Sequence, residues 1–194
     1  MNGVGDSTGP MTGTTPGKLS VLAVCLGNIC RSPTAEAVLQ SLIEKEGADA
    51  GCIVVDSCGT GGGNPNWYKD GGWSYHEGDA ADSRMQETAS RRGIHLTSTS
   101  RPLSRADLET FDVIIAMDTS NVAAIKEAAA YWGEQYAELA SRKVRMMMDF
   151  HSDPSRHGTA VPDPYYSGLD GFELVLDLLE DSCRGLLASL RTLP

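Results

Sequence analysis

The stretch KLSVLAVCLGNICRSP, residues 18–33, decides the fold of this 194-residue chain. Its first half, Lys18–Cys25, is a short apolar run that ends before Gly27-Asn28, a pattern typical of a buried strand. Ser32 and Pro33 then predict the start of a helix, with Ser32 as the N-cap and proline in the first helical position. The sequence therefore predicts a strand that passes through a short loop directly into a helix.

The rest of the chain continues this alternation of strands and helices. After Pro33, apolar residues recur at helical spacing, and Gly47 is the predicted end of this helix. A second strand is predicted at Cys52–Asp56. Further helices are predicted over residues 82–92, 119–131 and 172–190, and further strands over residues 112–117 and 144–148. We therefore expect an α/β fold: a single-domain, doubly wound sheet of four parallel strands flanked by helices, with a phosphate-binding loop between the first strand and the first helix.

Two segments fall outside the alternation. Residues 1–17 are rich in Gly and Thr and lack the apolar stretch of a secretory signal, which predicts a flexible tail before a domain at 18–194. Residues 61–74 lie in a long glycine-rich loop without periodicity, and the family resemblance described below implies that they are an inserted segment. We expect Trp67 and Trp73 in this segment to pack against the fold.

Composition excludes several classes of function. The 26 acidic residues outnumber the 16 basic ones, giving a net charge of −10, which disfavours binding to nucleic acid or to an anionic membrane. No apolar run approaches the ~20 residues that span a bilayer. Five cysteines without a disulfide-scaffold spacing favour a reducing compartment, and we expect a cytoplasmic protein. The four histidines show no zinc-like spacing with cysteine, so we expect neither a metal nor a cofactor.

The loop after the first strand carries the chemistry. The N-terminus of a helix binds anions through its unpaired N–H groups and dipole, and the fork of Arg31 can hold two phosphate oxygens. The same field favours the thiolate of Cys25, to which Ser32 can donate a hydrogen bond. The sequence thus predicts a metal-free site for covalent phosphoryl transfer whose phosphate-binding residues are Leu26, Gly27, Asn28, Ile29, Cys30 and Arg31.

This stretch resembles the signature of low-molecular-weight protein tyrosine phosphatases. The resemblance covers roughly residues 19–190 and includes the motifs Asp56-Ser57, Tyr75-His76-Glu77-Gly78, Ala116-Met117-Asp118 and Asp163-Pro164-Tyr165-Tyr166. It implies that Cys25 attacks the phosphorus while Arg31 holds the equatorial oxygens. It also implies that Asp163 protonates the leaving phenol and then activates the hydrolytic water.

The resemblance assigns further roles. Asn28, Ser32 and Ser57 match a hydrogen-bond network that braces the loop, in which Ser98 replaces a histidine of many animal members. Cys30 matches a redox partner that traps oxidised Cys25 as a disulfide. Ile29 matches members directed to phosphotyrosine, whereas phosphoarginine phosphatases carry threonine there. The aromatic residues expected at the substrate entrance are Tyr75, Tyr165 and Tyr166. The implied partners are phosphotyrosine-containing proteins, and we expect a monomer.

Two other functions stay open. An arsenate reductase on the same scaffold needs a closely spaced pair of relay cysteines, which Cys58 and Cys183 do not provide. A non-catalytic phosphotyrosine-binding or redox-sensing module would have no need of Asp163 as a general acid.

Overall fold

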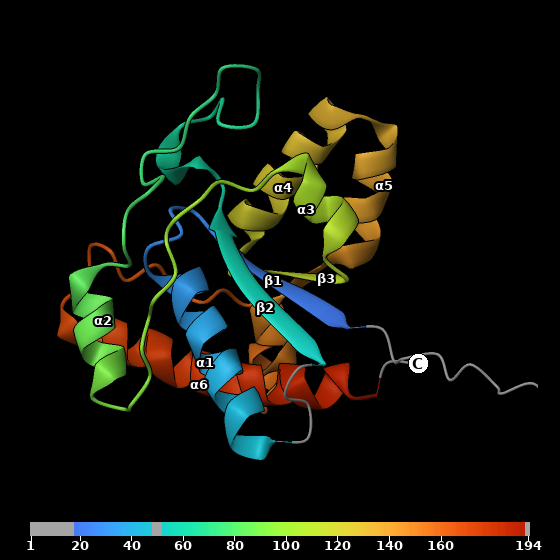
Figure 1. Cartoon of the computed structure of the whole chain (residues 1–194). Coiled ribbons are helices and arrows are strands. Elements are labelled where there is room, and N and C mark those ends of the chain that lie inside the picture. The colour runs from blue at the N-terminus through green and yellow to red at the C-terminus, as the bar shows by residue number, and fades with distance from the viewer. Residues whose placement is uncertain (1–17, 48–51, 193–194) are drawn as a thin grey trace, which may run out of the picture.

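A four-stranded parallel sheet forms the centre of the protein (Figure 1). The computed structural model describes residues 18–47 and 52–192, so the predicted tail at 1–17 lies outside the described residues. The strands are β1 (Leu19–Cys25), β2 (Ile53–Gly59), β3 (Val113–Ala116) and β4 (Val144–Met146), in the spatial order β2-β1-β3-β4. The central strand β1 pairs with β2 from Leu19 to Cys25 and with β3 from Val21 to Val24. The predicted fold class is confirmed.

Helices cover both faces of the sheet because alternate strand residues point to opposite sides. Val21 and Ala23 pack into a core shared with α1 (Arg31–Glu46) and α6 (Leu169–Leu190), and α2 (Ser83–Ser90) lies against α6. Leu22 and Val24 pack into the opposite core, which includes residues of α3 (Arg105–Thr110), α4 (Thr119–Trp132) and α5 (Glu134–Lys143). Figure 1 shows these two helical layers on either side of the strands.

The start of α1 differs from the sequence prediction. The helix begins at Arg31 with Cys30 as its N-cap, so Ser32 lies inside the first turn and the prediction of Ser32 as the cap is wrong. The hydroxyl of Ser32 instead donates to Cys25 Sγ at 3.1 Å and to the carbonyl of Cys58 at 3.2 Å. Contacts with the neighbouring strand ends therefore decide the role of this side chain, rather than local capping preference.

Other elements also differ from the sequence prediction. The short helix α3 was not predicted, although it starts with a capping box between Ser104 and Asp107. Helix α5 follows α4 after Gly133, whose φ of 136° permits the change of direction. Strand β4 ends at Met146, two residues earlier than expected, and the following 3₁₀ helix Met147–Phe150 starts with two buried methionines.

The 61–74 segment is fixed to the fold by one of its two tryptophans. Trp67 is 7% exposed and packs in the core on the α4 side of the sheet, as expected, whereas Trp73 is 51% exposed, so the expectation that it packs is wrong. Gly61 has a φ of 90°, and a Cβ there would lie 2.4 Å from the Trp67 side chain, so only glycine allows this close approach.

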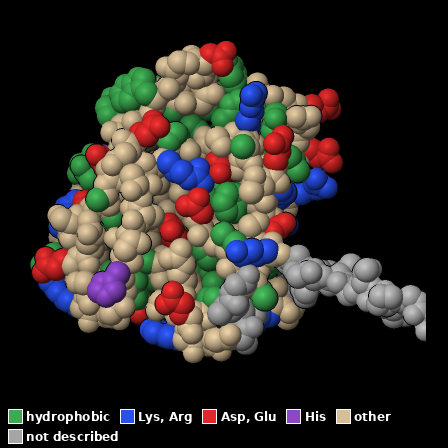
Figure 2. Space-filling model, in the orientation of Figure 1, with side chains coloured by type: hydrophobic (Ala, Val, Ile, Leu, Met, Phe, Trp, Pro, Cys, Tyr) green, Lys and Arg blue, Asp and Glu red, His purple; other side chains and the backbone are tan. Residues whose placement is uncertain are grey.

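The surface agrees with the charge balance of the sequence. On the face in Figure 2, acidic and basic side chains are interspersed, and hydrophobic side chains gather at the upper left. No helix within residues 18–47 and 52–192 combines the length and apolar character needed to cross a bilayer.

Candidate active site

The loop from Cys25 to Cys30 joins the end of β1 to the start of α1 and wraps around the thiol of Cys25. This thiol accepts hydrogen bonds from the backbone N–H of Asn28 at 3.3 Å and from Ser32 Oγ at 3.1 Å. Cys25 is 2% exposed and lies at the N-terminal end of a 16-residue helix. Two donors and the helix dipole together stabilise negative charge on the sulfur.

Asn28 holds the loop in shape. Its φ of 55° is the one positive φ among the described non-glycine residues, and asparagine tolerates this conformation better than most residues. Its Nδ2 donates to Ser32 Oγ at 2.9 Å and to Ser57 Oγ at 2.8 Å, while its Oδ1 accepts from the N–H of Arg101 at 2.9 Å. The side chain therefore ties the loop to α1, to β2 and to the segment before α3.

A buried carboxyl group stands behind this network. Ser57 Oγ donates to Glu36 Oε2 at 2.6 Å, and Ser98 also hydrogen-bonds to Glu36. Burial raises the pKa of the Glu36 carboxyl, although the hydrogen bonds from Ser57 and Ser98 oppose the shift. Ser98 thus keeps a polar contact with the network at the position where many animal members carry a histidine.

Glu36 was missed by the sequence analysis. Its signal was its place four residues after Ser32, which puts the two side chains on the same face of α1.

Arg31 faces the thiol and is held by two carboxylates. Its Nη1 donates to Asp118 Oδ2 at 2.5 Å and to the carbonyl of Val161 at 3.2 Å, and its Nη2 donates to Asp163 Oδ2 at 3.2 Å. The guanidinium is 3% exposed; burial disfavours its charge, but Cys25 and Asp118 outweigh burial and raise the pKa of Arg31. Asp118 also caps α4 by accepting from the N–H of Asn121, and its contact with Arg31 was not foreseen.

Asp163 lies on the loop before α6, at the rim of the same site. Its Oδ2 contacts Arg31, and its Oδ1 accepts from the N–H of Tyr165 at 3.2 Å. The side chain is 41% exposed, so water and a ligand can both reach it. The arrangement places a proton donor or acceptor across the cavity from the thiol.

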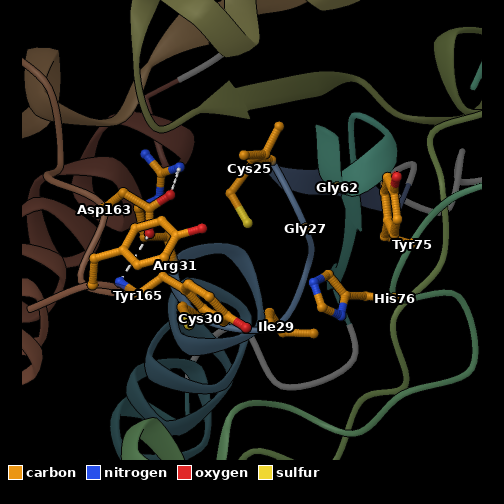
Figure 3. Close-up of a pocket in the computed structure, with 12 residues that line it drawn as sticks. Cys25, Gly27, Ile29, Cys30, Arg31, Gly62, Tyr75, His76, Asp163 and Tyr165 are labelled. Carbon is orange, nitrogen blue, oxygen red and sulfur yellow. Dashed lines mark hydrogen bonds and ion pairs between the residues drawn. The ribbon is translucent and has the colours of Figure 1, made fainter. Parts of the chain in front are cut away.

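A cavity of about 320 Å³ opens above the loop (Figure 3). Cys25 Sγ points into it, with Arg31, Asp163 and Tyr165 on one side and Tyr75 and His76 on the other. Most residues predicted for the site line this space: Cys25, Leu26, Gly27, Ile29, Cys30, Arg31, Tyr75, Asp163, Tyr165 and Tyr166. The other predicted residues, Asn28, Ser32 and Ser57, lie behind the cavity wall. Their hydrogen bonds connect them to one another and to Cys25 Sγ.

His76 also lines the cavity and was not predicted as a site residue. Its Nδ1 lies 3.1 Å from Asp79 Oδ2, and its ring packs against Gly27, where a Cβ would come within 3.0 Å of it. The signal for His76 was its place next to Tyr75 in the Tyr75-His76-Glu77-Gly78 motif.

Cys30 is buried in the cavity wall. Desolvation raises the pKa of its thiol far above its ordinary value, and the charge of Asp82 adds to the shift. Cys58 and Cys183 are both fully buried, the first in the core beside α4 and the second in the core beside α6. Because the sheet separates them, they cannot act as a relay pair.

The arrangement is suited to an anion that reacts with a nucleophile. Backbone N–H groups and Arg31 provide positive charge, Cys25 provides the nucleophile, and Asp163 can exchange a proton. The described residues contain no group of three or more His, Cys, Asp or Glu side chains that could hold a metal ion.

Comparison with known proteins gives consistent matches over nearly the whole chain. The family model described as low molecular weight phosphotyrosine protein phosphatase matches residues 20–193. A putative low molecular weight protein-tyrosine-phosphatase of Synechocystis is 40% identical over 173 residues, which is 89% of this chain and 96% of that protein.

Solved structures show the same similarity. A protein tyrosine phosphatase of Entamoeba histolytica matches with a TM-score of 0.73 at 40% identity, covering 89% of this chain and 97% of its own. A Drosophila arginine phosphatase matches with a TM-score of 0.72 at 27% identity, covering 89% and 98% of the two chains. Similar scaffolds therefore carry two different phosphate substrates.

Proposed function

Because this chain belongs to the low molecular weight phosphotyrosine protein phosphatase family, a family of cysteine-based phosphatases, we propose that it hydrolyses phosphotyrosine in proteins. The observation that carries the proposal is the meeting of Cys25, Arg31 and Asp163 at one cavity, with two hydrogen-bond donors on the thiol. A binding module would need the anion site but not the nucleophile and the acid opposite each other.

In the first step, Cys25 Sγ attacks the phosphorus and forms an S–P bond as the P–O bond to the tyrosine ring breaks. Arg31 and the loop N–H groups hold the three equatorial oxygens, where negative charge is spread in the transition state. The proton of Asp163 passes to the leaving phenolate oxygen. Substrate phosphate replaces Asp163 as a partner of Arg31, while Asp118 keeps its hold on Nη1.

In the second step, the carboxylate of Asp163 takes a proton from water, and the water oxygen attacks the phosphorus. The S–P bond breaks, inorganic phosphate leaves, and the sulfur returns as a thiolate. The N–H of Asn28 and the hydroxyl of Ser32 stabilise this leaving thiolate, because both already point at Sγ.

The walls of the cavity favour a phenyl ring over a guanidinium. Ile29 presents a hydrocarbon side chain to the cavity, and the rings of Tyr165 and His76, 6.4 Å apart, border it. A phenyl ring packs against such groups without leaving a hydrogen-bond donor unpaired, whereas the N–H groups of phosphoarginine need acceptors. We propose phosphotyrosine proteins as partners on this basis.

Hydrolysis of an aryl phosphate in the presence of a chelator tests the chemistry. Cys25→Ser should abolish turnover, and Asp163→Ala should slow it by ~10²-fold or more, since an unprotonated phenolate leaves poorly. Asp170→Ala, which removes an exposed carboxylate at the start of α6, is the matched control and should retain the wild-type rate. Wild-type turnover no faster than that of Cys25→Ser would refute the mechanism.

The substrate is tested separately with peptides. Two peptides of the same sequence carry either phosphotyrosine or phosphoarginine at the same position. The kcat/KM should be higher for the phosphotyrosine peptide. A higher value with phosphoarginine would leave the mechanism standing but overturn the proposed substrate.

A further inference from the structure

A second cavity, of about 250 Å³, lies beside the first and is separated from it by Leu26 and the turn Gly61–Gly63. Leu26 lines both cavities, Gly62 lines the first and Gly63 lines the second. The carbonyl of Leu26 accepts from the N–H groups of Thr60 and Gly62, both at 2.9 Å, which fixes this partition. A peptide whose phosphotyrosine occupies the first cavity can therefore reach the second with a nearby side chain.

The wall formed by the 61–74 segment is firmly held. The ring of Trp67 packs edge-on against Trp132 at 6.1 Å, and Tyr68 packs likewise against Tyr131 at 5.4 Å. Trp132 Nε1 also donates to the carbonyl of Tyr68 at 3.0 Å. These contacts join the segment to the end of α4, so the second cavity has aromatic walls with a defined position.

The opposite wall is one face of α4. Ser120, Asn121, Ala124 and Glu127 recur along it, and the small side chain of Ala124 leaves the space between its neighbours open. Asn121 is 2% exposed, and its Oδ1 has no hydrogen-bond partner among the described residues. Because this oxygen has almost no accessible surface, a ligand in the cavity does not reach it, and the exposed residues of this face of α4 provide the polar contacts.

Glu127 gives the cavity its charge. It is the one charged side chain among the described residues that line the space. Its Oε1 accepts from Tyr68 Oη at 2.8 Å, and no described residue donates to its Oε2. Lys69 holds its Nζ 5.6 Å from the ring of Tyr68 and donates to Asn66 outside the cavity. An ammonium group of the protein thus already lies over the ring of Tyr68, so the carboxylate of Glu127 rather than this ring provides the contact for a substrate cation.

These features are complementary to a basic side chain. The stem of lysine or arginine can pack along the aromatic wall of the cavity, while its N–H groups reach the exposed carboxylate of Glu127. An acidic side chain would meet the carboxylate of Glu127 and a molecule of net charge −10. We propose that the second cavity is a specificity subsite for a lysine or arginine close to the phosphotyrosine of the substrate protein. This subsite rests on the proposed function, because it selects among phosphotyrosine substrates.

Steady-state kinetics with phosphotyrosine peptides test the subsite. The peptides carry a single lysine, norleucine or glutamate at successive positions on either side of phosphotyrosine in an otherwise constant sequence. Norleucine keeps the stem without the charge. Lysine should raise kcat/KM over norleucine by about fivefold at one or two positions at low salt, the size that a solvent-exposed ion pair gives, and glutamate should lower it.

Three variants separate the cavity from the general field of the protein. Glu127→Gln should bring the lysine-to-norleucine ratio close to one, and Ala124→Leu should do the same by filling the space while keeping the carboxylate. Glu138→Gln removes a carboxylate on α5 that is also exposed and should keep the wild-type ratio. Thermal melting shows that each variant is folded, and the ratio within each variant corrects for changes in overall rate.

The outcomes are distinct. The subsite is refuted if the wild type hydrolyses aryl phosphate but shows no lysine preference at any position. It is also refuted if the lysine preference survives in Glu127→Gln. Both results leave the proposed function intact. A preference for glutamate would show that the start of α4 binds anions and would also overturn the proposal. Failure to hydrolyse aryl phosphate would refute the proposed function, and the subsite with it.

Discussion

Replacing Asn28 with alanine should be among the most damaging changes that leave the nucleophile in place. The side chain makes three hydrogen bonds, to Ser32 and Ser57 as a donor and to the N–H of Arg101 as an acceptor. At about 1 kcal/mol net for each bond, their loss lowers the free energy of unfolding by about 3 kcal/mol. Alanine at a φ of 55° adds a further cost of about 1 kcal/mol.

Glycine at the same position separates the two contributions. Asn28→Gly loses the same hydrogen bonds but tolerates the positive φ, so it should be about 1 kcal/mol more stable than Asn28→Ala. Both variants loosen the N–H that points at Cys25 Sγ. We therefore expect kcat/KM for an aryl phosphate to fall by about 10²-fold in each, because displacement of reacting groups by about 1 Å has that effect.

Urea unfolding followed by circular dichroism gives the stabilities. Asn66→Ala is the matched control, because Asn66 is an exposed asparagine whose side chain accepts a hydrogen bond from Lys69. This variant should stay within about 0.5 kcal/mol of the wild type. An Asn28→Ala variant within about 1 kcal/mol of the wild type would show that Asn28 does not brace the loop. An Asn28→Ala variant as stable as Asn28→Gly would show that the positive φ adds no cost.

Two further predictions concern titration and oxidation. Burial raises the pKa of Glu36 above its ordinary 4.5, so the folded protein holds that proton more tightly than the unfolded chain and loses stability as pH rises above 4.5. Glu36→Gln should therefore reduce the drop in unfolding free energy between about pH 4 and about pH 7, and an unchanged drop in urea titrations would contradict this. Peroxide should convert Cys25 to a sulfenic acid, which condenses with the Cys30 thiol to a disulfide and water. Because the raised pKa keeps Cys30 a neutral thiol, disulfide formation should accelerate with pH. Cys30→Ser should recover less activity with added thiol than the wild type; equal recovery would exclude the protective role.

The order of strands and helices could be predicted from the sequence because its signals are local. An apolar run followed by Gly27-Asn28 indicates a strand end, and regular apolar spacing indicates a helix, wherever the rest of the chain lies. Cys25 and Arg31 were predictable for the same reason, since one loop carries both. Asp163 was found through its resemblance to a family motif. The missed helices α3 and α5 are short, with six and ten residues.

Asp118 and Ser32 show what the sequence did not determine. Arg31 and Asp118 are 87 residues apart, and no pattern along the chain pairs them. Ser32 fits the pattern of a helix cap, yet the ends of β1 and β2 bring Cys25 Sγ and the Cys58 carbonyl within its reach. A side chain with several possible partners takes the one that folding brings close, and this depends on contacts distant in the sequence.

The sequence by itself determined that a short loop carrying Cys25 and Arg31 joins a strand to a helix, because the residues that build it are contiguous. Only the tertiary structure decided that the 61–74 segment folds back on α4 and leaves a second cavity beside that loop. The packing of Trp67 on Trp132 fixes this position, and these residues lie in different elements. Which surfaces meet is set by burial across the whole core, and that information is not carried by any single stretch of the chain.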